Sequence, residues 1–133
     1  MAHLNENAIT LLETTAGVNL NAAAGTETAL YTVPAGKTAL VTHIVIHSVS
    51  ADANLSVVTF GKTGGACDEF RGDQTLSDLD AAGKYTVVYL DQGVNDTPES
   101  ATEFDAGDEV GVEITTAAGN SCTCTMSVFG FLI

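Results

Sequence analysis

Apolar residues recur at every second position along most of this chain, which is the spacing of a β-strand with one buried face. Near the C-terminus, Cys122, Cys124, Met126 and Val128 alternate with small polar residues. Residues 38–50 are apolar on both faces, which predicts a strand that is central or covered on both sides. Turn-forming residues such as Pro, Gly and Asn separate the apolar runs. The pattern predicts strands over residues 9–13, 28–33, 38–50, 55–61, 84–91, 109–116 and 121–133.

Short strands bounded by turns are typical of an all-β protein, and we expect a single jelly-roll-like antiparallel β-sandwich with negligible helix. A chain of 133 residues is long enough to bury one core and too short for two, so we expect one domain over residues 1–133. Within it, residues 1–20 form either an extended N-terminal arm or the strand at 9–13. Residues 62–83 and 92–103 are polar and weakly periodic, which indicates two long loops.

The charge of the chain is strongly one-sided. Seventeen Asp and Glu residues face four Lys and Arg residues, and the formal net charge is −13 at pH 7. Such a surface repels phosphate backbones and anionic lipids, so we expect neither nucleic acid nor a membrane among the partners. No apolar run approaches the ~18 residues of a spanning helix, and the first residues lack the pattern of a secretory signal. We therefore expect synthesis in a cytoplasm and a soluble product.

The histidines and cysteines do not form a recognisable metal site. His43 and His47 share one face of a predicted strand but lie roughly 13 Å apart along it, so they cannot bind one ion together. Cys122 and Cys124 also share a face, and their spacing exceeds the reach of a disulfide. Cys67 could pair with one of them under oxidising conditions. We expect no metal and no cofactor, and we interpret the cysteines as buried free thiols.

Two segments resemble known ligand-binding loops but lack residues that those loops require. Gly61-Lys62-Thr63 follows a predicted strand, but the earlier glycine and the following helix of a phosphate-binding loop are missing. Residues 78–83 begin like a calcium-binding EF-hand loop, yet Ala82 and Tyr89 stand where oxygen ligands are required. Neither segment therefore predicts a ligand.

The remaining polar motifs also leave the chain without a catalytic set. Arg71-Gly72-Asp73 spells the tripeptide that integrins bind, and we interpret it as a turn. Carboxylates between residues 91 and 113 could bind calcium or serve as a glycosidase pair, but a solvated acidic surface is the simpler interpretation. No nucleophile, base and orienting group can be placed together. We predict no catalytic residues and no enzyme activity.

The C-terminal strand carries large apolar residues on its polar side. Past Val128, the residues Phe129, Phe131 and Ile133 continue the face that holds threonines earlier in the strand. An exposed apolar patch usually marks a partner surface, although a neighbouring loop could also cover it. We predict that Phe129, Phe131 and Ile133 form the contact of a homo-oligomer, most simply a trimer.

The end of the chain resembles a known family. Residues 104–114 (Phe-Asp-Ala-Gly-Asp-Glu-Val-Gly-Val-Glu-Ile) and the ending Val-Phe-Gly-Phe-Leu-Ile resemble the closing strands of the tumour-necrosis-factor and complement-head jelly rolls. Those families have a Gly-Asp pair before a strand and a Phe-x-Gly-Phe-Leu terminus near a trimer axis. The spacing of Gly130 departs from their Ser-Phe-Ser-Gly pattern. The resemblance implies a jelly roll and a trimer.

A second segment resembles virus proteins. Residues 31–38 (Tyr-Thr-Val-Pro-Ala-Gly-Lys-Thr) and the β-branched strand after them look like a segment of small β-sandwich virion proteins of tailed bacteriophages. The resemblance implies a structural virion protein, made in the host cytoplasm, that decorates or cements the outer surface of the phage head. Its partners would be further copies of itself and the major capsid protein or another virion protein. The alternatives are a tail or fibre module that contacts a host receptor through the loops 62–83 and 92–103, and a secreted jelly-roll binding module.

Overall fold

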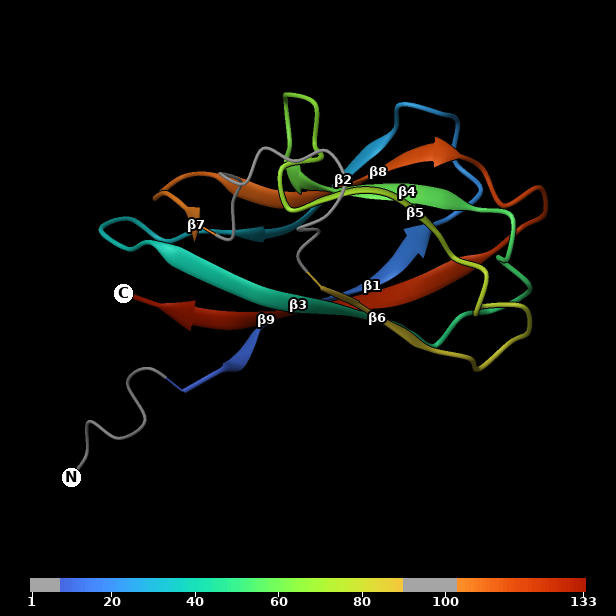
Figure 1. The fold of residues 1–133 in the computed structure, drawn as a ribbon, viewed down its shortest axis with the longest axis horizontal. Helices are drawn as coiled ribbons and strands as arrows, with labels where there is room; N and C mark the ends of the chain where they lie inside the picture. Colours follow the sequence, from blue (N-terminus) through green and yellow to red (C-terminus); the bar gives the residue numbers. More distant parts are fainter. Residues whose placement is uncertain (1–7, 90–102) are drawn as a thin grey trace.

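Nine β-strands form two antiparallel sheets that pack face to face in the computed structural model, which describes residues 8–89 and 103–133 (Figure 1). The described residues contain no helix. This is the all-β sandwich that the period-two pattern predicted. Sheet A has the order β1 (Thr10–Asn19), β9 (Thr123–Leu132), β3 (Ala39–His47) and β6 (Thr86–Tyr89), and the short β7 (Glu103–Phe104) also pairs with β3. Sheet B has the order β2 (Glu27–Thr32), β8 (Glu109–Thr116), β4 (Val57–Lys62) and β5 (Arg71–Thr75).

The strand pairing follows a nested order. The first strand pairs with the last, β2 with β8, β3 with β6, and β4 with β5. Successive pairs alternate between the two sheets, so the chain winds as a folded hairpin. Residues distant in sequence therefore lie side by side, and the outer surface of each sheet combines both halves of the chain.

The core lies between the sheets and is built from the alternating apolar residues. Sheet A contributes Ile44, Ile46 and Met126, and sheet B contributes Phe60 and Val112, all nearly or completely buried. Burial of such side chains stabilises the fold by about 1.5–3 kcal/mol each relative to exposure. Where small polar and apolar residues alternate, as in the first half of β9, the apolar side chains face inward.

One detail of the predicted pattern was wrong. Strict alternation along residues 38–50 predicts that Leu40 lies on the same face as Ile44 and Ile46. In the structure, a register shift against β9 falls between Val41 and His43. A β-bulge of this kind places two residues opposite one. The residues before the bulge therefore face the opposite side of the sheet from the side that strict alternation predicts. Val41, Ile44 and Ile46 are buried, while Leu40 lies on the outer side opposite Phe131.

Several predicted boundaries also change. The strand expected at 9–13 extends to Asn19 and pairs with β9. The segment 62–83, expected as a loop, contains β5. The predicted strand 84–91 corresponds to β6, and its last two residues and most of the insertion 92–103 lie outside the described residues. The tripeptide Arg71-Gly72-Asp73 lies in β5 and is not a turn.

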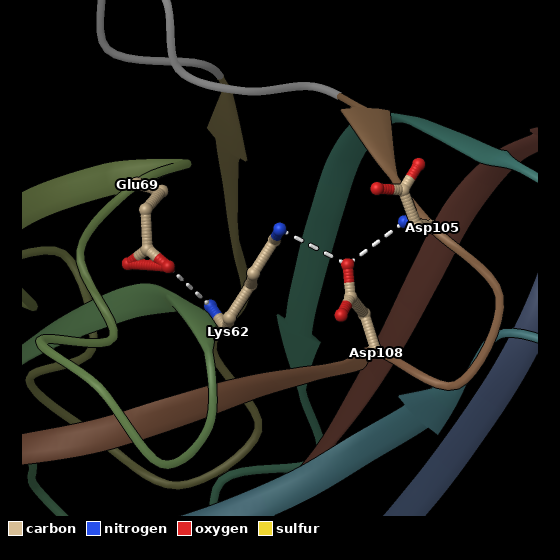
Figure 2. Close-up of polar contacts among 4 residues, drawn as sticks. All are labelled: Lys62, Glu69, Asp105 and Asp108. Carbon is tan, nitrogen blue, oxygen red and sulfur yellow. Dashed lines mark hydrogen bonds and ion pairs between the residues drawn. The ribbon is translucent and has the colours of Figure 1, made fainter.

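The Gly-Asp pair before β8 belongs to a turn that places Asp108 beside Lys62 (Figure 2). Gly107 has a φ of 90°, which glycine adopts without strain, and it allows a tight turn between Asp105 and Asp108. The Asp108 carboxylate accepts a hydrogen bond from the Asp105 amide at 2.8 Å and lies 3.0 Å from Lys62 Nζ at the end of β4. The amide of Lys62 in turn donates to the Glu69 carboxylate at 3.1 Å. These contacts tie the β7–β8 turn to the loop after β4.

Candidate interaction surface

A row of large side chains crosses the outer face of sheet A from edge to edge. Leu11 of β1 is opposite Phe129 of β9, Phe129 is opposite His43 of β3, and His43 is opposite Tyr89 of β6. Residues directly opposite in an antiparallel sheet project on the same side, so the four side chains form a continuous ladder. The residues Val45 and Val87 form a second apolar pair on this face. We call these six residues, together with Leu40 and Phe131, the outer face of sheet A.

The centre of the ladder is a stacked pair of rings. The imidazole of His43 and the phenyl ring of Phe129 have centroids 4.8 Å apart and planes 5° from parallel. Tyr89 lies on the other side of His43, at 5.9 Å between centroids and a tilt of 37°. Thr42 Oγ1 is 2.9 Å from His43 Nδ1, and the same hydroxyl donates to the Phe129 carbonyl at 3.2 Å. His43 is therefore held between two aromatic rings in a fixed orientation.

The polar groups of the outer face bind one another. Ser127 Oγ is 3.1 Å from Thr14 Oγ1 and 3.1 Å from His47 Nε2, so it links β1, β9 and β3. His47 Nδ1 lies 3.1 Å from the Ser48 hydroxyl. Ser127 is only 5% exposed. Thr14, Ser127 and His47 therefore already have hydrogen-bond partners within the chain, which lowers the cost of removing these groups from water.

The two sheets differ in the number of charged residues in their strands. Among the described strands of sheet A, only Glu13 and Glu103 are charged. Glu13 is opposite the buried Val128 and lines the opening beside Tyr31 of β2, so it belongs to the inner side of the sheet edge. Burial raises the pKa of Tyr31, and the negative charge of Glu13 raises it further. Glu103 stands at the end of sheet A, opposite Leu40. The centre of the outer face is therefore neutral.

Sheet B carries most of the strand charges. Its strands hold Glu27, Lys62, Arg71, Asp73, Glu109 and Glu113. The loop after β4 packs against this sheet, where Gly64 donates to Glu27 at 2.9 Å and Thr63 donates to Glu109 at 2.6 Å. An added Cβ at Gly61 would lie 2.6 Å from the Glu69 nitrogen, so only glycine permits this approach. Most charged residues of the described strands thus lie in sheet B, on the other side of the sandwich from the outer face of sheet A.

The three residues predicted as an oligomer contact lie near the C-terminal end of β9 or directly after it. Phe129 and Phe131 are partly buried in the outer face, and Ile133 is 56% exposed just beyond β9. No described loop covers the patch completely, because Tyr89 is 61% and Leu11 49% exposed beside these residues. Sequence reasoning missed Leu11, His43 and Tyr89 as members of the patch. Strand alternation gives the face of each residue, but the register that unites four strands appears only in the folded chain.

Other candidate residues are dispersed. His43 and His47 lie on the outer face and contact different neighbours. Cys67, Cys122 and Cys124 are buried free thiols. The Arg71 guanidinium reaches the Tyr89 carbonyl at 3.5 Å. Within residues 8–89 and 103–133, no group of three His, Cys, Asp or Glu side chains is arranged to hold a metal ion. No helix in this part of the chain is long and apolar enough to cross a membrane.

Comparison with known proteins shows a likeness at the level of the fold. No family model and no curated protein matches the chain. A solved structure of the cyanophage Pam1 capsid asymmetric unit contains a similar chain, with a TM-score of 0.51 and 12% sequence identity. The match covers 95% of this chain and 86% of that chain. At such low identity the two proteins share an architecture, and residue roles do not transfer from one to the other.

Proposed function

We propose that this protein is a structural component of a tailed-phage particle that decorates or cements the outer surface of the head. The observation that carries the proposal is the combination of a β-sandwich, one aromatic face without charged side chains at its centre, and an opposite sheet that carries most of the charged strand residues. The fold likeness to a chain of a cyanophage capsid unit supports the same assignment. The proposed role needs no cofactor, and we propose that the protein is not an enzyme.

The arrangement suits a protein that binds by shape. Apolar and aromatic residues supply most of the binding energy of protein interfaces, and a sheet presents them in fixed positions. The net charge of −13 keeps the exposed surface from adsorbing nucleic acid released or packaged nearby. We propose partners of two kinds: further copies of the chain in a homotrimer, with Phe129, Phe131 and Ile133 at the contact, and the major capsid protein.

The location and copy number of the protein in purified particles test the proposal. We expect mass spectrometry and imaging of the phage that encodes this chain to find it in many copies distributed over the head. A few copies at one vertex would support the tail or fibre role instead. Absence from washed particles would overturn the virion assignment.

Reconstitution provides a second test. Purified protein is added to heads that lack it, and the amount bound and the resistance of the heads to heat are measured. A cementing protein should bind to saturation and raise the temperature at which the heads release their genome. Binding without any gain in resistance would leave a decorating role and remove the cementing one.

A further inference from the structure

The outer face of sheet A fits a second copy of this chain. We propose that copies bind one another through it, so that this face lies at the contact between copies. The inference rests on the proposed structural role, in which copies assemble, and it extends the predicted contact at Phe129, Phe131 and Ile133 to a surface that crosses four strands. The centre of this surface is the stack of His43 on Phe129.

Exposed apolar residues are concentrated on this side of the molecule. The described residues include six strongly exposed large hydrophobic side chains. Five belong to strands of sheet A or directly flank them, and only Leu55 lies elsewhere: the five are Ile9, Leu11, Tyr85, Tyr89 and Ile133. A two-layer sandwich normally solvates its outer faces with polar residues. A cluster of apolar residues on a single sheet therefore indicates that a partner covers that sheet.

The charge distribution favours a second copy as that partner. Two molecules that each carry −13 repel one another at long range, and they can approach closely only through surfaces without carboxylates. The outer face of sheet A is such a surface, because its only described carboxylate is Glu103 at the end. A basic partner would instead be attracted to the Glu residues of sheet B. The neutral face offers such a partner no complementary charge.

The polar groups on the face do not oppose burial. Ser127, Thr14 and His47 form hydrogen bonds with one another, and Thr42 bonds to the Phe129 carbonyl. A partner that covers these groups leaves few unsatisfied donors or acceptors, which is the usual penalty for burying polar surface. The face can therefore be desolvated even though it is not uniformly apolar.

The size of the face is adequate. β1, β9 and β3 are each about 30 Å long and β6 is about 13 Å long, so at a strand spacing of about 4.8 Å they give a flat area of roughly 500 Å². Side-chain relief raises the accessible area above this value. A standard specific interface buries about 800 Å² on each partner. The outer face is thus of the order that a stable complex between two copies requires.

Sedimentation of the purified full-length chain over a range of micromolar concentrations tests the inference. We expect the wild-type chain to sediment as a multiple of the 13.6 kDa monomer. The substitutions Leu11→Asp and Tyr89→Asp place like charges on facing surfaces and should each weaken the association by about tenfold or more. Leu55→Asp is the matched control, because it adds the same charge at an exposed leucine away from sheet A and should leave the association unchanged. Circular dichroism shows whether every variant keeps the β-sandwich.

The outcomes separate the inference from the proposed function. A wild-type monomer at these concentrations, or an oligomer that Leu11→Asp and Leu55→Asp weaken equally, overturns the inference. The virion assignment would still stand if the monomer is found on particles. If the monomer binds heads and Tyr89→Asp abolishes that binding, the face belongs to the capsid partner and the second copy is excluded. The inference is supported if Leu11→Asp and Tyr89→Asp lose self-association while they stay folded, and Leu55→Asp associates like the wild type.

Discussion

The imidazole ring of His43 lies flat against the phenyl ring of Phe129, with 4.8 Å between their centroids and 5° between their planes. The two residues are 86 positions apart in the sequence and meet because β3 and β9 are neighbours in sheet A. Their contact joins the first half of the chain to its last strand. It is also the middle of the ladder that ends at Leu11 and Tyr89.

We expect this stack to stabilise the fold measurably. In a double-mutant cycle with His43→Ala and Phe129→Ala, the coupling energy should be about 0.5–1.5 kcal/mol, the range found for paired aromatic rings. Urea unfolding at a fixed protein concentration measures it. His47→Ala combined with Phe129→Ala is the control, because His47 lies opposite Thr125 and has no contact with the phenyl ring. Equal coupling in both cycles would contradict a direct interaction of the rings.

Gly130 should not tolerate a side chain. A Cβ at this position would overlap the Leu40 carbonyl oxygen and crowd the Val41 backbone, which cannot move without breaking the β3–β9 pairing. We expect Gly130→Ala to lower the free energy of unfolding by about 3 kcal/mol, at the upper end for overpacked sites. Gly65→Ala is the matched control, because nothing lies within 4 Å of its added Cβ, and its effect should stay within about 0.5 kcal/mol. Thermal or urea unfolding distinguishes the two. Similar stability of the two variants would refute the close approach.

The Gly-Asp turn and the terminal glycine show which parts of the sequence could be interpreted in advance. The resemblance to jelly-roll families rested on Gly107-Asp108 and on the ending around Gly130. The structure gives a physical reason for both. Gly107 has a positive φ, and the Asp108 carboxylate accepts a hydrogen bond from the Asp105 amide. Gly130 lies so close to the backbone of β3 that a Cβ would not fit. Local signals of this kind are visible in the residues themselves. The period-two alternation, which is also a local signal, predicted the all-β sandwich and the range of β8 without error.

Long-range register could not be predicted in the same way. The bulge between Val41 and His43 moved Leu40 to the outer side, and no local pattern marks it because both faces of that strand are apolar. The short strands β5 and β7 were missed, since β5 is polar, β7 has only two residues, and pairing with β4 and β3 defines them. The site residues Leu11, His43 and Tyr89 depend on the same register. Sequence alternation therefore found Phe129 and Phe131 but not their neighbours across the sheet.

The carboxylate of Asp108 should make stability depend on pH in the acid range. The hydrogen bond from the Asp105 amide lowers the pKa of Asp108 below its usual value of 3.8, and Lys62 lowers it further. A group with a lowered pKa in the folded state stabilises the protein above its unfolded pKa, and this contribution is lost as the pH falls through the folded value. Asp108→Asn should therefore reduce stability near neutral pH by no more than about 1 kcal/mol, because the pair is partly solvated.

The difference between wild type and Asp108→Asn should shrink as the pH falls below 3.8. Urea unfolding in neutral and acidic buffers measures it. Asp80→Asn is the control, because Asp80 and Lys84 form an ion pair in which both side chains are 54% exposed, and we expect no measurable change. A constant difference between wild type and Asp108→Asn at all pH values would exclude the proposed role of the carboxylate charge.

The buried thiols should set an alkaline limit to stability. Burial raises the pKa of Cys67 and of Cys124 from 9.0 to about 12. At Cys67 nearby carboxylates raise the pKa further, with Glu27 the largest, and at Cys124 the neighbouring Cys122 adds to the rise. The folded state favours the neutral thiol. The contribution of each buried thiol to the stability of the fold is therefore complete below pH 9 and is lost as the pH rises toward 12. Each thiol should lower the free energy of unfolding by up to about 1.4 kcal/mol per pH unit in that interval.

Urea unfolding in reducing buffers at and above pH 9 checks this expectation. Cys124→Ala should be less stable at neutral pH because it leaves a small cavity, but its stability should fall less steeply with pH than that of the wild type. Since the thiolate is the reactive form, both thiols should also resist maleimide in the native protein and react readily once it is unfolded. Rapid labelling of the native chain at neutral pH, or equal slopes for wild type and Cys124→Ala, would show that these sulfurs are not shielded as the sandwich places them.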